Sequence, residues 1–235
     1  MNNSHDSSSH LSRVLEPEVM DTVEDAHDYD SMDHREVNEL FVTHLLKHIQ
    51  NNDQLGNIPV LPILDVGTGT AQIPIELCLR FESARISAID LAEQMIAKAQ
   101  SNVTQADLQN RIFLQTIDAK SMPYEDHHFP VVMSNSIVHH IPCPEMVLSE
   151  MVRVIQSGGL IFVRDLLRPE KIQPLRDLVD RYAGEANAHQ RLLFHQSLHA
   201  SLTIDEMRAH IRKLGIPPKT VEQTSDRHWT WTCLL

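Results

Sequence analysis

The chain has 235 residues, enough for one domain with a sizeable core and a small appendage, but not for two large domains. Its 32 Asp and Glu residues outnumber its 20 Lys and Arg residues, and the net charge of -12, with no cluster of basic residues, argues against binding to a nucleic-acid backbone. The cysteines form no C-x-x-C pair, and neither a secretory signal nor a membrane-spanning apolar run is recognisable, so we expect a cytoplasmic protein.

Polar and helical segments precede the first predicted strand. Residues 1–10 are polar and rich in serine, which predicts a disordered tail. Apolar residues recur at helical spacing in "VNELFVTHLLKHI", and we therefore expect residues 11–55 to form an N-terminal helical extension. On this interpretation residues 1–56 are a tail with cap helices, and residues 57–235 are the main domain.

Strand and helix patterns alternate from residue 57 onward. Apolar, β-branched runs predict five strands, at "VLPILDV", "ARISAID", "RIFLQTI", "PVVMSN" and "GLIFVRDL". Between them, amphipathic patterns predict helices that begin near Gln72 and that cover residues 92–103 and 144–155. This alternation predicts a parallel sheet with helices on both faces.

The alternation stops after Leu167. Residues 167–202 lack a strand pattern and predict a helical insertion. Because the insertion follows the carboxyl end of a strand, where open α/β sheets bind ligands, we interpret it as a lid over the substrate, with an ordinary helix pair as the alternative. A capping box of Thr203 and Glu206 then begins a helix that ends at Gly215, and "PKTVEQT" and "HWTWTCLL" can each form a strand.

A glycine-containing loop, "DVGTGTAQ", follows the first predicted strand and opens a helix. Gly67 and Gly69 can adopt backbone angles closed to other residues and let a ligand approach the main chain at a helix amino terminus. A dinucleotide-binding loop requires a third glycine where this chain has Gln72, which disfavours NAD. Asp65 precedes the loop, and its charge suits a cationic or zwitterionic ligand better than a pyrophosphate.

Two further carboxylates follow the next strands at the same edge of the sheet. Asp90 ends the second strand, where it can accept hydrogen bonds from both hydroxyls of a ribose. Asp118 follows the third strand and can accept from an adenine amino group, with the backbone at Ala119 close to the ring. Any one of these carboxylates alone is better explained as a helix cap or a solvated loop residue. Three of them beside a glycine loop indicate a nucleotide-like ligand.

The motifs, taken in order, resemble those of the class I S-adenosylmethionine-dependent methyltransferases. The resemblance covers about residues 57–166 and ends with "HHIPCPEMVLSEMVRVIQSGG" before the fifth strand. It implies a Rossmann-like, doubly wound, mostly parallel seven-stranded sheet whose last strand is antiparallel. It also implies S-adenosylmethionine as the cofactor, although Ala71 stands where a glycine is common in the family. The cofactor-binding residues that it implies are Asp65, Gly67, Gly69, Asp90, Leu91, Asp118, Ala119 and Asn135.

The stretch "SNSIVHHIP" bears on the methyl acceptor. Methyltransferases acting on nucleobase or glutamine amino groups often carry an Asn/Asp-Pro-Pro-Tyr-like motif here, whereas this stretch looks more like that of small-molecule members. We therefore expect an enzyme that moves a methyl group to a small molecule by in-line displacement. Two alternatives stay open: a methyltransferase acting on a protein or RNA, and an NAD-binding or non-catalytic nucleotide-binding protein. A homodimer is an open alternative to a monomer.

His139 and His140 lie in the turn after the fourth strand. In a helical turn consecutive side chains diverge by about 100°, so one should face the pocket while the other packs. By the resemblance the first of the two approaches the transferred methyl, so His139 is our candidate for a substrate-positioning residue or base, with His140 as its packing partner. Asp165, at the end of the fifth strand, is the second catalytic candidate. The alternative is that both histidines are structural.

Three weaker signals complete the site prediction. Tyr29 is our candidate for an aromatic contact near the cofactor, and the N-terminal helices with residues 167–202 are expected to close over the substrate. His195 and His199 share a helix face, but a metal would need a third ligand that the sequence does not identify. We therefore predict no metal site.

Overall fold

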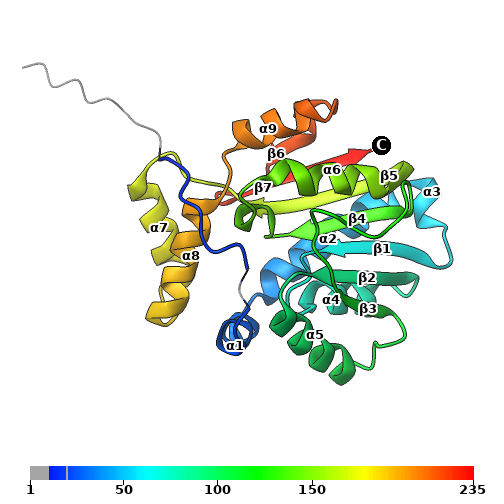
Figure 1. The fold of residues 1–235 in the computed structure, drawn as a ribbon, viewed down its shortest axis with the longest axis horizontal. Helices are drawn as coiled ribbons and strands as arrows, with labels where there is room; N and C mark the ends of the chain where they lie inside the picture. Colours follow the sequence, from blue (N-terminus) through cyan, green and yellow to red (C-terminus); the bar gives the residue numbers. More distant parts are fainter. Residues whose placement is uncertain (1–10, 20) are drawn as a thin grey trace, which may run out of the picture.

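The computed structural model describes residues 11–19 and 21–235, so the predicted tail at residues 1–10 lies outside the described residues. Seven strands form one sheet in the order β3-β2-β1-β4-β5-β7-β6 (Figure 1). β1 to β5 pair in parallel, and β7 runs antiparallel to both of its neighbours. The predicted mostly parallel sheet with an antiparallel last strand is therefore confirmed. The strands are β1 (Leu61–Val66), β2 (Ala84–Asp90), β3 (Ile112–Thr116), β4 (Phe129–Asn135), β5 (Ile155–Leu166), β6 (Val221–Gln223) and β7 (His228–Leu234).

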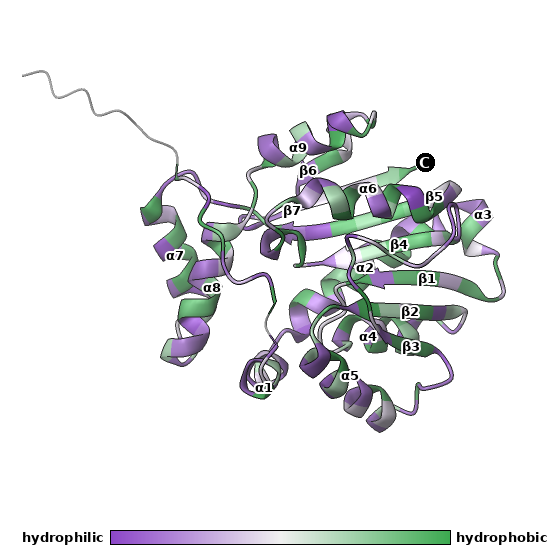
Figure 2. Cartoon of the chain, viewed as in Figure 1, coloured by the Kyte–Doolittle hydropathy of each residue, from purple (hydrophilic) through white to green (hydrophobic). Residues whose placement is uncertain are grey.

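Helices cover both faces of the sheet. Side chains alternate across a strand, so Ile63 of β1 packs with the helices on one face, whereas Leu64 packs with those on the other. In Figure 2 the strands form an apolar centre, and the helices turn polar residues outward. α2, α4 and α5 cover the first face, and α6 and α9 cover the second. The helices are α1 (Val23–Ser31), α2 (Arg35–Gln50), α3 (Asp53–Gly56), α4 (Gln72–Arg80), α5 (Glu93–Gln105), α6 (Pro144–Val154), α7 (Ile172–Ala183), α8 (Ala188–Ala200) and α9 (Ile204–Lys213).

The insertion after β5 is helical, as predicted. It forms α7 and α8, which lie side by side beyond the carboxyl ends of the parallel strands (Figure 1). Leu166, Leu175, Leu178, Val179 and Leu198 form a small apolar cluster of their own, separate from the two clusters that flank the sheet. The pair is therefore held together mainly by its own packing and adds a wall beyond the edge of the sheet.

The prediction of a helical extension from residue 11 is wrong for its first part, because α1 begins only at Val23. Residues 11–19, which we call the strap, form neither helix nor strand. Their main-chain groups bond outward instead: Leu11 donates its N–H to Glu170 O at 2.7 Å, and Val14 donates to His199 O at 3.2 Å. A backbone tied to the insertion in this way cannot also form helical hydrogen bonds.

Candidate active site

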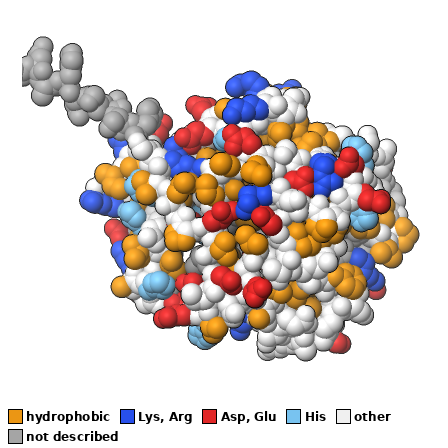
Figure 3. All heavy atoms as spheres, in the orientation of Figure 1, with side chains coloured by type: hydrophobic (Ala, Val, Ile, Leu, Met, Phe, Trp, Pro, Cys, Tyr) orange, Lys and Arg blue, Asp and Glu red, His pale blue; other side chains and the backbone are white. Residues whose placement is uncertain are grey.

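A pocket lies at the carboxyl ends of the parallel strands, where seven of the eight predicted cofactor-binding residues meet. Figure 3 shows a hollow near the centre of the molecule in this view, with acidic side chains around it. The predicted residues that line the pocket are Gly67, Gly69, Asp90, Leu91, Asp118, Ala119 and Asn135. The eighth, Asp65, is buried and lines a small adjoining cavity. The loops after β1, β2, β3 and β4 thus converge on one site, as parallel strands require.

The loop after β1 depends on glycine geometry. Gly67 and Gly69 have φ of +74° and +55°, and a Cβ added at Gly67 would lie 2.4 Å from the side chain of Ile137. Ala71 also has a left-handed backbone, with φ of 63°. This explains why a glycine is common at that position, since the left-handed conformation costs a residue with a Cβ about 1 kcal/mol. The loop is therefore tightly fixed against the turn that follows β4.

Asp90 holds the glycine loop in place as well as facing the pocket. Its Oδ2 accepts the N–H of Gly69 at 2.8 Å, and its Oδ1 accepts the N–H of Ala92 at 3.0 Å. Burial raises the pKa of Asp90 above its ordinary value, although these backbone N–H groups oppose the shift. Each carboxylate oxygen retains a lone pair, so the side chain can still accept from ribose hydroxyls.

Asp65, Asn135 and Tyr29 surround the small cavity next to the glycine loop. Burial raises the pKa of Asp65 to about 7. The Oδ1 of Asn135 is also buried and has no hydrogen-bond partner among residues 11–19 and 21–235. A ligand ammonium would satisfy this oxygen and stabilise the charge on Asp65, so the chemistry of this end fits the amino-acid part of S-adenosylmethionine. A Cβ on Gly69 would lie 3.5 Å from the Tyr29 ring, so Tyr29 covers the loop.

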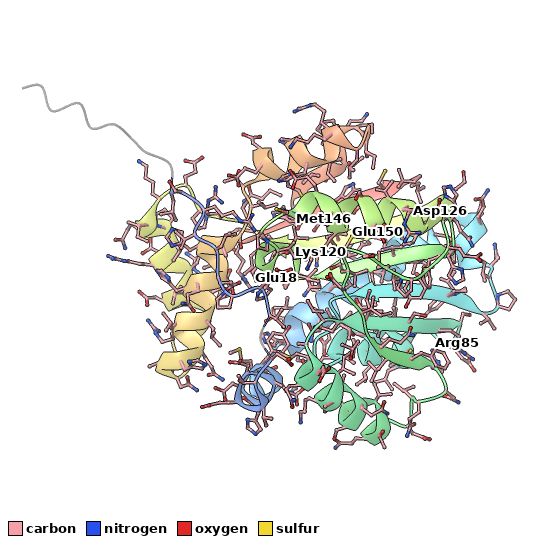
Figure 4. All side chains as sticks on the ribbon, viewed as in Figure 1. Glu18, Arg85, Lys120, Asp126, Met146 and Glu150 are labelled. Atoms are coloured by element: carbon pink, nitrogen blue, oxygen red, sulfur yellow. The ribbon has the colours of Figure 1, made fainter. Side chains whose placement is uncertain are left out.

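The rim of the pocket near Asp118 carries an ion-pair chain that sequence reasoning missed. The Nζ of Lys120 lies 3.1 Å from Asp118 Oδ1 and also contacts Glu18 of the strap (Figure 4). Glu18 and Lys120 are 102 positions apart in the sequence, and no local pattern predicts that they meet. This contact closes the strap over the end of the pocket where we predict the adenine.

The histidine turn differs from our expectation. His139 is buried, with its Nδ1 2.6 Å from Asp165 Oδ1, whereas His140 lines the pocket. The two rings do not diverge: their centroids are 4.2 Å apart with an interplanar angle of 33°. The turn is a single 3-10 turn, Val138–His140, and His140 at its end is followed by an extended residue, so helical spacing does not control where the second ring points. The predicted orientations of His139 and His140 are therefore reversed with respect to the pocket.

Both histidines meet Glu16 of the strap, which the sequence did not identify as a site residue. Glu16 Oε1 lies 3.4 Å from His139 Nε2 and 3.2 Å from His140 Nδ1. Within the described part of the chain, these three residues form the one group whose ligand atoms, all within 4.8 Å of one another, could hold a metal ion. His195 and His199 instead meet ring edge to face, with centroids 6.1 Å apart.

The charges in this cluster depend on one another. Burial alone would lower the pKa of His139, but the Asp165 carboxylate, with a contribution from Glu16, raises it above its ordinary value. Burial would raise the pKa of Asp165, and the adjacent His139 holds it below its ordinary value. Burial lowers the pKa of His140 to about 3, and the neighbouring His139 adds to the shift. The cluster therefore favours one charged imidazole, on His139, between two carboxylates.

Comparison with known proteins supports the fold and S-adenosylmethionine as the cofactor. Residues 63–159 match the family model described as a methyltransferase domain. The chain is 28% identical over 164 residues to 27-O-demethylrifamycin SV methyltransferase of Amycolatopsis mediterranei, covering 69% of this chain and 56% of the relative. It is 29% identical over 148 residues to a demethylmenaquinone methyltransferase of Desulfitobacterium hafniense, covering 57% of this chain and 58% of the relative. The chain thus spans little more than half the length of these relatives.

Solved structures share the fold at low sequence identity. The plantazolicin methyltransferase BpumL, in complex with SAH, superposes with a TM-score of 0.69 at 16% identity, covering 89% of this chain and 88% of that chain. An S-adenosylmethionine-dependent methyltransferase from Aquifex aeolicus has a TM-score of 0.61 at 16% identity, covering 90% of this chain and 97% of that chain.

Sheet order, ordered motifs and domain match together define a class. Residues 63–159 match a methyltransferase domain, the chain has the fold of the class I S-adenosylmethionine-dependent methyltransferases, and S-adenosylmethionine is the cofactor of this class. Within residues 11–19 and 21–235, every helix is too short or too polar to cross a membrane.

Proposed function

We propose that the protein transfers a methyl group from S-adenosylmethionine to a small-molecule acceptor held between the cofactor pocket and the histidine turn. The observation that carries this proposal is the position of His140, which lines the cofactor pocket and contacts the buried pair of His139 and Asp165. A polar cluster enclosed by the strap and α8 suits a compact acceptor better than an exposed macromolecular groove. The names of the rifamycin and demethylmenaquinone relatives point to the same acceptor class.

In this proposal the cofactor supplies an electrophilic methyl group on a positively charged sulfur. Asp65 and Asn135 hold the ammonium group, Asp90 holds the ribose, and Asp118 with Ala119 holds the adenine. These contacts fix the direction of approach, and in-line displacement depends chiefly on that alignment. The strap, together with the insertion at residues 167–202, closes over the acceptor and keeps water from the reacting centre.

His139 is proposed as the base and Asp165 as the residue that orients it. The contact of 2.6 Å between His139 Nδ1 and Asp165 Oδ1 keeps an N–H on Nδ1, so Nε2 is the atom through which the ring loses and takes up a proton, and His139 acts as a base only after Nε2 has lost its proton. Nε2 lies 3.4 Å from Glu16 Oε1 of the strap, and the His139 ring lies beside the ring of His140. A base is required only where the acceptor atom carries a proton that must leave.

Labelled cofactor tests the proposal directly. The protein is incubated with S-adenosylmethionine carrying a labelled methyl group and a cell extract divided by size into metabolites and macromolecules. We expect a labelled product in the metabolite fraction, identified by mass spectrometry, and none with Asp90→Ala. Label found only in protein or RNA would contradict the proposal. Calorimetry with S-adenosylhomocysteine and with NAD separately tests the cofactor, and binding of NAD alone would contradict the assignment of Asp65, Asp90 and Asp118.

A further inference from the structure

Two carboxylates face His139, and their hydrogen bonding differs. Asp165 accepts from His139 Nδ1 at 2.6 Å, from the His139 main-chain N–H at 3.1 Å and from the Leu166 N–H at 2.6 Å. Glu16 Oε1, by contrast, is buried and has no hydrogen-bond partner among the described residues, and the same holds for His140 Nδ1 beside it. Asp165 is thus built into the fold, whereas Glu16 fills a position between two histidines without meeting their hydrogen-bonding requirements.

Glu16 can leave this position without disturbing the sheet. The strap that carries it has neither helix nor strand, and Glu16 itself is bonded through Oε2 to the Ser197 hydroxyl at 3.3 Å. The strap is anchored by Arg13, whose guanidinium donates to Ala200 O at 2.6 Å and to the main-chain oxygens of His139 and Ile141, both at 3.1 Å. Glu18, farther along the strap, lines the cofactor pocket. Movement of the strap would therefore open the histidines and the cofactor pocket together.

We propose that His139 and His140 form a binding subsite for the oxyanion of an acidic hydroxyl group, such as a phenol or an enol, and that Glu16 occupies this subsite until the acceptor displaces it. The carboxylate of Glu16 has the charge and the oxygen atom that such an acceptor would present at the same place. This inference deepens the proposed function, on which its catalytic part rests.

The chemistry of the subsite follows from the groups around His139. These are Asp165 from β5, Glu16 and Arg13 from the strap, and His140 from the same turn. In the closed protein the His139 imidazolium pairs with Glu16, and as Glu16 is displaced it takes the Nε2 proton with it, which leaves the His139 ring neutral. The hydroxyl proton of the acceptor then passes to His139 Nε2, and the imidazolium formed again pairs with the oxyanion. When that oxygen is the nucleophile, its bond to the methyl carbon forms as the carbon–sulfur bond breaks, and the electron pair stays on sulfur.

The test uses the full chain saturated with S-adenosylhomocysteine and two probes of equal size, benzoate and benzamide. We expect benzoate to bind Glu16→Ala at least about tenfold more tightly than it binds the wild type, because the competing carboxylate is gone. Glu16→Gln keeps the shape of the side chain and should show a smaller gain. Glu24→Ala removes one exposed charge from α1 and should match the wild type. Benzamide should bind all four proteins equally weakly.

Titration of the His139 ring by NMR gives a second readout that needs no turnover. Loss of the Glu16 carboxylate should lower the pKa of His139, and bound benzoate should raise it again. Equal benzoate affinity in folded wild type and Glu16→Ala would overturn the proposal, and so would an equal gain for benzamide, which would indicate mere cavity filling. Zinc binding that requires Glu16 would also overturn it, because Glu16 would then be a metal ligand. Since these readouts measure binding, they can succeed even if the acceptor search fails.

Discussion

The cofactor side of the pocket is made by loops that directly follow β1, β2 and β3, whereas the acceptor side combines the histidine turn with the strap and α8. On the cofactor side Asp90 bonds to the backbone of Gly69 and Ala92, so the loops hold one another. On the acceptor side Arg13, Glu16 and Ser197 make the connections through side chains from segments outside the sheet. The first region is held by hydrogen bonds to its own backbone, and the second is held by side-chain contacts that a ligand can replace.

This difference separates two tasks. The cofactor is the same for every member of the class, and a site built from backbone geometry serves it without adjustment. Under the proposed function the acceptor must enter, be oriented and leave, and side-chain contacts from a segment without secondary structure permit that movement. Changes on the cofactor side should therefore weaken binding, while changes on the acceptor side should chiefly alter turnover.

The largest expected effect is on the acceptor side. His139→Ala should lower turnover by about 10² to 10⁴ if His139 is the base, with cofactor affinity nearly unchanged. Steady-state kinetics on the acceptor, together with calorimetry of S-adenosylhomocysteine, measures both quantities. His27→Ala is the matched control, because the His27 side chain is 76% exposed. Asp165→Asn should lower turnover too, and the double variant should be no worse than His139→Ala. Full turnover by His139→Ala would break the proposed division of tasks.

The next largest effect is expected on the cofactor side, from a change at Asp90. Asp90→Ala should weaken cofactor binding about a hundredfold, because charged hydrogen bonds contribute about 1.5–3 kcal/mol each and two ribose hydroxyls lose their acceptor. The same change frees the N–H groups of Gly69 and Ala92, so the melting temperature should also fall. Asp205→Asn, at a side chain that is 91% exposed, is the control. Unchanged affinity in a folded Asp90→Ala protein would remove Asp90 from the site.

Cofactor affinity should depend on pH because of Asp65, which we propose to hold the ammonium group. The pKa of Asp65 is about 7 in the free protein, raised by burial, and an ammonium beside it favours the ionised form. Above that pH the carboxylate is already charged; below it, binding must release a proton, so affinity should fall by up to about tenfold per pH unit. Calorimetry at pH 8 and pH 6 measures the difference. Asp65→Asn should bind more weakly with no such slope, and a flat wild-type profile would contradict the assignment.

The smallest effect is expected where the two sides meet. Lys120 joins Asp118 to Glu18 of the strap, and such partly exposed ion pairs contribute only about 0–1 kcal/mol. Lys120→Gln should therefore change cofactor affinity by no more than about fivefold. The difference from wild type should shrink in 1 M salt, which screens the pair. A much larger loss, insensitive to salt, would indicate that the strap is part of the rigid cofactor site.

The cofactor side was largely predictable from the sequence. Asp65, Gly67 and Gly69 lie within one strand and its loop, and Asp90 and Asp118 lie at the ends of the next two strands. In a parallel sheet those ends share one edge, so strand order along the chain already brings the residues together. The left-handed backbone at Gly67 and Gly69 is likewise a local requirement that only a few residues can meet without strain. The helical insertion was also predicted, because a strand pattern is a local feature of the sequence and residues 167–202 lack one.

On the acceptor side the sequence named His139 and Asp165 as candidates, but tertiary structure decided how they are arranged and what surrounds them. The strap was predicted to be helical because the segment that contains it leads into the helical pattern "VNELFVTHLLKHI", yet Val14 of the strap bonds to the end of α8, nearly the whole chain away. The side chains of His139 and His140 were expected to diverge, but they lie on a 3-10 turn and both rings contact the Glu16 carboxylate. Arg13 reaches His139 across 126 positions, and no pattern of neighbouring residues encodes such a contact. The sequence determined the residues whose positions follow from strand order and backbone angles, and only packing between distant segments decided which side chains surround the histidine turn.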